Sequence, residues 1–161
     1  SDTAITFYKT IQNKFHYAIT GNTAAEIVYK RVDSKKENMG LTTWENSPDG
    51  KILKSDVIIA KNYLNEQEIK NLNNLVNLFL DIAENNAERS ITMYMEDWKN
   101  EVENALKVFH YEVLEGKGKI SHKQAVEKAE NEYEKYKVIQ DKNYVSDFDR
   151  LLSETKQIEN K

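Results

Sequence analysis

His16 is the side chain in this sequence best suited to proton transfer, because an imidazole titrates near neutral pH and can act as a general base. It lies in the stretch QNKFHYAITGNTAAEIVYKRVDSKKENMGLTTW, residues 12–44, which also holds an Asn-Met-Gly-Leu turn able to point backbone N–H groups at a ligand. The candidate polar cluster consists of Gln12, His16, Thr20, Thr23, Glu26, Asn38, Lys54, Lys61 and Asn62. Two interpretations are open: a ligand-binding or catalytic cluster, or a partly exposed histidine that hydrogen-bonds near the C-terminal end of its helix, where a cation is mildly favoured.

Other reactive motifs are missing from the sequence. The three histidines, at positions 16, 110 and 122, have neither the His-x-x-x-His nor the Glu-x-x-His spacing of helical metal sites, and the chain has no cysteine. The GKGK at 116–119 lacks the frame of a phosphate-binding loop, and there is no Gly-x-Ser-x-Gly of a serine hydrolase. We therefore expect no metal and no cofactor.

Composition restricts the partners of the chain. Its net charge is -4 and its basic residues form no stripe, whereas non-specific binding to nucleic acid needs several Lys or Arg contacts to phosphate. The longest apolar run, LVNLFLDIA, is far shorter than the roughly 18 residues of a membrane span. The lack of cysteine fits the cytosol. We expect a cytoplasmic protein that binds neither nucleic acid nor membranes through this chain.

The hydrophobic pattern predicts an all-α fold, a bundle of six to seven helices. Apolar residues recur at helical spacing over 3–18, and capping boxes mark helix starts at Thr23, Asn65 and Ser121. The stripe that follows Asn65 is wide enough to predict a central, mostly buried helix of about 24 residues. Further helices are predicted from a cap at Ser55, from Thr92 to near Gly116 and Gly118, and from a cap at Ser146 through Phe148, Leu151, Leu152 and Ile158.

Helical periodicity is lost over 33–51, which predicts one long loop. Such a loop inside a compact domain is uncommon enough to indicate a function or mobility. Trp44, in its middle, is expected to anchor the loop to the core. The polar cluster could also serve only to hold this loop in place.

Tyrosines gather on the helix that starts at Ser121 and just after it. Tyr133, Tyr136 and Tyr144 form either part of the core or a surface for a partner helix, and the sequence leaves both open. The dense charges over 96–137 are most simply a solvated face.

Several stretches resemble a known family, in the same order along the chain. They are FYKTIQNKFHYAITGNTAAEIVYKRVD, NMGLTTW, KSDVIIAKNYLNEQEIKNLNNLVNLFLDIAE, ISHKQAVEKAENEYEKY and SDFDRLL. They resemble the C-terminal helical domain of the virulence protein RhuM family of bacteria. The resemblance implies that residues 1–161 form a single helical domain, the C-terminal part of a longer protein whose N-terminal region is similar to phage-type DNA-binding or antirepressor domains. Some relatives of that N-terminal region are joined to Fic/Doc domains, but the Fic signature His-Pro-Phe-x-Asp/Glu-Gly-Asn-x-Arg is missing here.

These observations lead to two functional hypotheses. The first is a non-enzymatic interaction or oligomerisation module, whose partner is another protein or a second copy, accompanying an N-terminal DNA-binding region. The alternative is a small-ligand-binding or enzymatic domain, such as a degenerate Fic-like domain, that uses the polar cluster around His16. The alternative requires that the cluster converge on one concave pocket.

Overall fold

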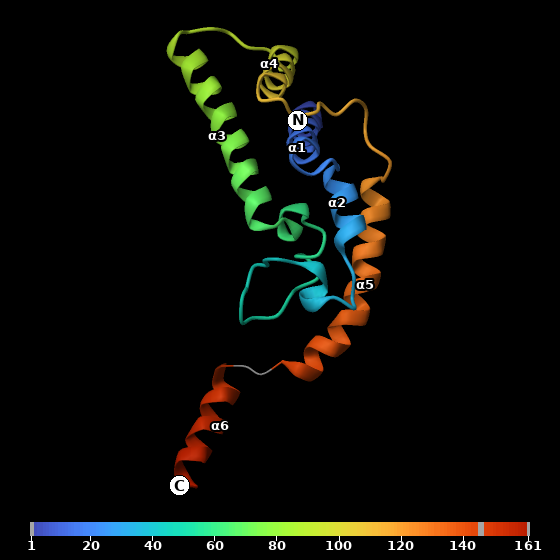
Figure 1. Ribbon diagram of the computed structural model, residues 1–161, viewed down its shortest axis with the longest axis vertical. Helices are drawn as coiled ribbons and strands as arrows, with labels where there is room; N and C mark the ends of the chain where they lie inside the picture. The colour runs from blue at the N-terminus through green and yellow to red at the C-terminus, as the bar shows by residue number, and fades with distance from the viewer. Residues whose placement is uncertain (1, 145–146, 161) are drawn as a thin grey trace.

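The structure is a computed structural model that describes residues 2–144 and 147–160. Within these residues the chain forms six α-helices and two short 3-10 helices, η1 and η2, and no strand (Figure 1). The elements are α1 Asp2–Thr20, α2 Ala24–Arg31, η1 Glu37–Gly40, η2 Ala60–Tyr63, α3 Glu66–Glu88, α4 Met95–Val108, α5 His122–Asn143 and α6 Asp147–Glu159. The all-α class is confirmed.

Three helix starts follow the local rules read from the sequence. At α2, the Glu26 N–H donates to Thr23 Oγ1 at 3.3 Å, and the Thr23 N–H donates to Glu26 Oε1 at 2.8 Å. The same reciprocal exchange is present at Asn65 before α3 and at Ser121 before α5. Each box satisfies backbone donors that the first turn of a helix leaves free.

One core joins helices α1 to α5. α2 packs along α5 and against η2, while α1 packs against α2, α3 and α4. Ile27 of α2 and Leu106 of α4 are fully buried, and the core also includes Phe15 of α1 and Ala129 of α5. α1 is therefore the element that connects the α2–α5 pair to the α3 and α4 helices.

The segment of residues 32–64, between α2 and α3, is irregular but closely packed. The loop predicted over 33–51 continues to η2, and Trp44 in it is buried, with Nε1 donating to the Gly50 carbonyl at 2.8 Å. From α5, the Gln140 side-chain amide accepts from the Ile52 N–H at 2.8 Å and donates to the Ile52 carbonyl at 2.9 Å. These bonds hold the 32–64 segment against α5.

The α-helix predicted from a cap at Ser55 is wrong. Residues 54–58 form turns, and the only helical residues that follow before α3 are the four of η2. The reason is Asp56, whose buried carboxylate accepts the N–H groups of Glu45 at 3.1 Å and Leu53 at 2.7 Å. A side chain that binds nearby backbone donors competes with the helical hydrogen-bond pattern.

The predictions for α3 and α4 are wrong in two respects. α3 has the predicted length, but only Leu72 and Leu75 are buried, while Val76 and Leu80 are 37% and 55% exposed, so it is not mostly buried. Leu72 and Leu75, with Ile69 and Phe79 beside them, pack on the core, and the edge of the apolar stripe at Val76 and Leu80 is left uncovered. α4 begins at Met95 instead of Thr92 and ends at Val108, far before Gly116, because the chain turns away at His110, whose φ is 63°.

α6 extends beyond the end of α5, at the lower end of the molecule in Figure 1. The predicted apolar positions Phe148, Leu151, Leu152 and Ile158 are all exposed. The cap predicted at Ser146 lies outside the described residues.

Candidate functional site

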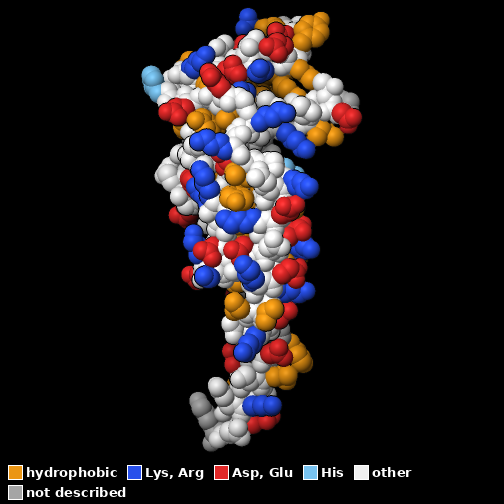
Figure 2. Space-filling model, turned by 90° about the vertical axis from the view of Figure 1, so that its right-hand side faces the viewer, with side chains coloured by type: hydrophobic (Ala, Val, Ile, Leu, Met, Phe, Trp, Pro, Cys, Tyr) orange, Lys and Arg blue, Asp and Glu red, His pale blue; other side chains and the backbone are white. Residues whose placement is uncertain are grey.

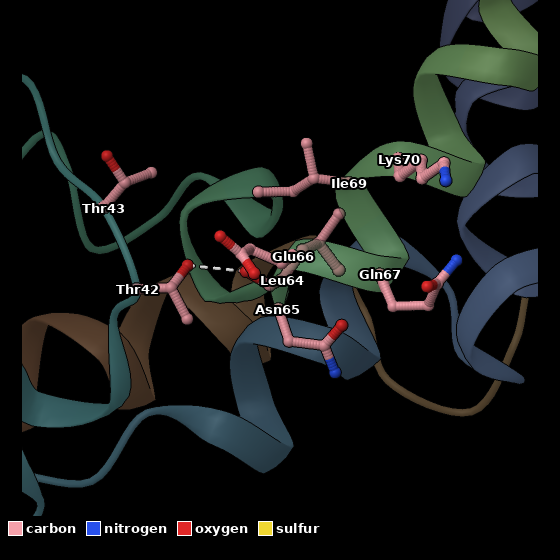
Figure 3. A pocket seen from close by; sticks show the side chains of 8 residues that line it. All are labelled: Thr42, Thr43, Leu64, Asn65, Glu66, Gln67, Ile69 and Lys70. Carbon is pink, nitrogen blue, oxygen red and sulfur yellow. Dashed lines mark hydrogen bonds between the residues drawn. The ribbon is translucent and has the colours of Figure 1, made fainter.

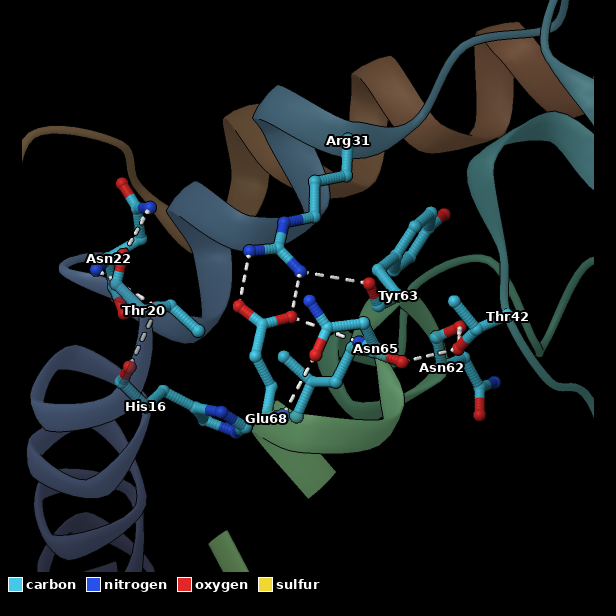
Figure 4. A network of polar contacts seen from close by, with 10 residues as sticks. His16, Thr20, Asn22, Arg31, Thr42, Asn62, Tyr63, Asn65 and Glu68 are labelled. Atoms are coloured by element: carbon cyan, nitrogen blue, oxygen red, sulfur yellow. Dashed lines mark hydrogen bonds and ion pairs between the residues drawn. The ribbon is translucent and has the colours of Figure 1, made fainter. Parts of the chain in front are cut away.

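His16 lies in a buried environment between the end of α1 and the start of α3 (Figure 4). Its side chain is 1% exposed, and its Nδ1 has no hydrogen-bond partner among the described residues. Burial, and secondly the charge of Lys61, lower the pKa of His16 to about 4. An imidazole with this pKa is neutral at pH 7 and is a weak general base.

Three other members of the cluster have structural roles at the turn between α1 and α2. Thr20 Oγ1 donates to the His16 carbonyl at 2.7 Å and accepts from the Asn22 N–H at 3.0 Å, which closes the end of α1. Thr23 and Glu26 form the capping box of α2. Burial alone would raise the pKa of Glu26, but the hydrogen bonds that Thr23 and the Lys119 N–H donate keep it below its usual value.

The buried side of this capping box lies against Gly118. A Cβ built on Gly118 would come within 2.6 Å of Thr23 Cγ2 and 3.1 Å of Glu26 Oε1, and the φ of Gly118 is +78°. The turn that contains GKGK therefore packs on the start of α2. This accounts for one of its glycines without a bound phosphate.

The remaining cluster residues lie in other surroundings. Gln12 and Lys61 are exposed, and Asn38 occupies a left-handed turn with a φ of 51°. Lys54 Nζ lies 3.8 Å from Glu130 Oε2 and 3.9 Å from Glu134 Oε1 on α5. Asn62 Nδ2 donates to the Asp56 carbonyl at 2.9 Å. The structure brings His16 near Lys61 but does not gather the nine residues around one cavity.

The strongest polar contact near His16 involves a residue outside the predicted cluster. Arg31 makes a bidentate ion pair with Glu68, with Nη1–Oε1 and Nη2–Oε2 distances of 2.7 and 2.8 Å, and Nη1 also donates to the Tyr63 carbonyl (Figure 4). Glu68 accepts from the Asn65 N–H as well, so it joins the cap of α3 to α2. The capping box predicted at Asn65 accounts for Glu68 only as part of a helix cap. Its ion-pair partner could not be read from the sequence, because the irregular 32–64 segment lies between the two residues.

This pair shifts the ionisation of both groups. The hydrogen bonds from Arg31 are the main reason that the pKa of Glu68 is lowered, and the same bonds raise the pKa of Arg31. Both charged forms are stabilised by this pairing. The pair fastens α2 to α3.

A groove of about 830 Å³ lies between the 32–64 segment and the start of α3 (Figure 3). It is lined by Thr42, Thr43, Leu64, Asn65, Glu66, Gln67, Ile69 and Lys70. Thr42 Oγ1 is already bonded to the carbonyls of Asn62 and Leu64. None of the nine cluster residues lines this groove.

The three candidate interface tyrosines differ in exposure. Tyr133 is buried in the core, Tyr136 is half-buried, and Tyr144 is 39% exposed with Lys51 Nζ 4.8 Å from its ring centroid. Tyr133 therefore offers no free surface, whereas Tyr144 does.

Charge is mixed over the surface. On the face in Figure 2, Lys and Arg side chains alternate with Asp and Glu. In residues 2–144 and 147–160, no group of three or more His, Cys, Asp or Glu side chains is placed to hold a metal ion. No helix in this part of the chain is long and apolar enough to span a membrane.

Large apolar side chains are uncovered at both ends of the molecule. At the end formed by α1, α3 and α4, we define the apolar end surface as Ile5, Tyr8, Val76, Leu80, Ile91, Tyr94, Met95, Val108 and Phe109. At the opposite end, the α5–α6 surface consists of Val138, Ile139, Tyr144, Phe148, Leu151, Leu152 and Ile158. Groups of large exposed apolar side chains are found at sites of protein association.

Comparison with known proteins gives one match. The sequence model of the virulence protein RhuM family matches residues 1–145, which include α1 to α5 and end before α6. Searches of curated proteins and of solved structures find no match to this chain.

Proposed function

This chain belongs to the virulence protein RhuM family, and we propose that its helical domain is a non-enzymatic interaction module that binds a protein partner. In this proposal DNA contacts belong to an N-terminal region of the kind that the family resemblance implies. The helical domain itself binds protein.

The observation that carries the proposal is the uncovered edge of the apolar stripe of α3, at Val76 and Leu80. Leu72 and Leu75 pack against α1 and the core. Val76 and Leu80, toward one edge of the same apolar stripe, are exposed. A helix with so wide an apolar stripe is stabilised most when both edges of the stripe are buried. The chain covers one side, and a partner protein would cover the other.

The rest of the apolar end surface supports the same proposal. Tyr94 and Val108 are each 71% exposed, at the two ends of α4, and Phe109 follows at 56%. Aromatic residues and methionine are enriched at protein interfaces, and this surface includes two tyrosines, one phenylalanine and Met95. Its chemistry fits an apolar helix or groove of another protein.

The arrangement of the polar cluster gives the enzymatic alternative little support. Ligand sites are concave and hold a few convergent polar groups. Here Glu26 is engaged in a helix cap, Lys54 pairs with α5, and His16 is buried and does not line the groove beside α3. The cluster positions α1, α2 and the 32–64 segment.

Site-specific photo-crosslinking in the native host tests the proposal. A photoreactive amino acid at position 80 should give a crosslink to one discrete protein. The same group at position 81 should not, because successive helical residues point about 100° apart. The double variant Val76→Asn, Leu80→Asn, with the photoreactive group at position 109, should lose the crosslink. Equal labelling from positions 80 and 81, or none from either, would overturn the proposal.

A further inference from the structure

We propose that the α5–α6 surface is a dimerisation surface whose partner is a second copy of this chain. This inference rests on the proposed function, in that it treats the protein as an interaction module, but it concerns a different surface and names the occupant.

α6 has an amphipathic pattern that its own chain does not use. Phe148, Leu151, Leu152 and Ile158 follow the 3-4 spacing of one helix face and are 67%, 59%, 44% and 72% exposed. An isolated helix of about 13 residues is marginal in water, because helices in proteins owe most of their stability to packing of the apolar face. α6 therefore requires cover whenever it is formed.

The end of α5 adds further exposed apolar side chains near α6. Val138, Ile139 and Tyr144 are exposed on the last turns before α6. Figure 2 shows several groups of exposed hydrophobic side chains on the lower part of the molecule. The α5–α6 surface thus extends over two helices.

The area of this surface matches what a dimer requires. The exposed fractions of its seven side chains together equal about four whole side chains, or on the order of 800 Å² at about 200 Å² each. A stable interface buries about 800 Å² on each partner. One α5–α6 surface is thus large enough to cover another.

A second copy of the chain also has a suitable surface charge and is available at a suitable concentration. The polar rim carries both signs of charge, with Glu154, Lys156 and Glu159 on α6 and Asp141 and Lys142 on α5, so a like surface is not repelled by a single-sign field. A copy is always present at the concentration of the chain itself, and two-fold dimers are the commonest assemblies of soluble proteins. Self-association can thus keep α6 covered at all times.

The test is the mass of the full chain in solution by light scattering and sedimentation, over a wide concentration range. We expect twice the monomer mass of 18.8 kDa. The double variant Leu151→Glu, Leu152→Glu should raise the dimer dissociation constant at least 100-fold. The matched control is Ser153→Glu, Gln157→Glu, which adds the same charge to the opposite face of α6 and should leave the dissociation constant within a few-fold.

Circular dichroism of each variant confirms that the core helices are retained. A strictly monomeric full chain at high concentration would overturn the inference. A dimer that both double variants leave intact would also overturn it, because self-association would then use a surface other than the α5–α6 surface. If the chain is monomeric but the crosslink from position 80 forms, the dimer inference is wrong and the proposed function stands. If the chain is dimeric but the crosslink does not form, the proposed function is wrong and the dimer inference stands.

Discussion

The 32–64 segment and the α3–α4 arm, residues 66–108, differ in how completely their side chains are covered. The 32–64 segment has little regular structure, yet it buries Val32, Met39, Ile52 and Val57 almost fully. The α3–α4 arm consists of two regular helices but has a large share of its apolar side chains in solvent. Regular secondary structure and burial are therefore separate properties in this fold, because each depends on different contacts.

The difference arises from how backbone groups are satisfied. In the α3–α4 arm the helices satisfy their own backbone, so the arm can stand with one side uncovered. In the 32–64 segment the backbone depends on side chains such as Asp56, Trp44 and Gln140. This segment can be stable only while it is packed against α2 and α5. Substitutions should therefore reduce folding stability most in the 32–64 segment and affect association most in the arm.

Gly40→Ala is expected to have the largest effect, about 5 kcal/mol on the free energy of unfolding. A Cβ on Gly40 would lie 2.2 Å from the Arg31 carbonyl oxygen, and its φ is +92°. Gly116→Ala is the matched control, since its φ is +78° but no atom lies within 4 Å of the added Cβ. It should cost only about 1 kcal/mol. Urea unfolding of both variants measures the difference, and similar losses would show that the contact with Arg31 is unimportant.

A pair of core and arm truncations sharpens the comparison. Ile27→Ala removes a fully buried side chain of α2 and should cost about 4 kcal/mol. Leu80→Ala removes a side chain that is 55% exposed and should cost under about 1 kcal/mol in the isolated chain, while weakening the crosslink at the apolar end surface. Thermal unfolding in the absence of any partner gives both values. A loss of several kcal/mol for Leu80→Ala would mean that the arm is already covered.

The same division explains what the sequence could predict. Helix starts at Thr23, Asn65 and Ser121 were predictable because a capping box depends on residues three apart. The turn at Asp56 was not, because its carboxylate binds the N–H of Glu45, eleven residues away.

Prediction of the candidate site from the sequence was limited in the same way, because the sequence does not show which distant residues are in contact. Apolar spacing located α3 but could not show that the edge of its stripe at Val76 and Leu80 is uncovered. The pairing of Arg31 with Glu68 has no local signal at all, since the two are 37 residues apart. His16 was a candidate because of its side-chain type, but its type and spacing did not reveal that it is buried and does not line the groove beside α3.

His16 should make a smaller, pH-dependent contribution to stability. Its pKa is about 4 in the folded protein and 6.5 in the unfolded chain, so the unfolded state takes up the proton first as the pH falls. The stability is fully present above pH 6.5 and is lost between pH 6.5 and 4, by about 3 kcal/mol in total. Glu26, Glu68 and Glu103 also have lowered pKa values and lose stability at still lower pH, so the wild-type curve alone does not isolate the histidine.

The variant His16→Leu separates these effects, because it fills the buried position without a titrating group. Its free energy of unfolding, measured by urea at intervals from pH 8 to 4.5, should fall less steeply than that of the wild type below pH 6.5. His122→Gln, at the exposed first turn of α5, is the matched histidine removal. Parallel curves for His16→Leu and the wild type would show that His16 takes up its proton in the folded state as readily as in the unfolded chain. That outcome would mean that His16 contacts solvent or a hydrogen-bond acceptor in the folded state. His16 would then not belong to the closely packed region that the comparison sets against the α3–α4 arm.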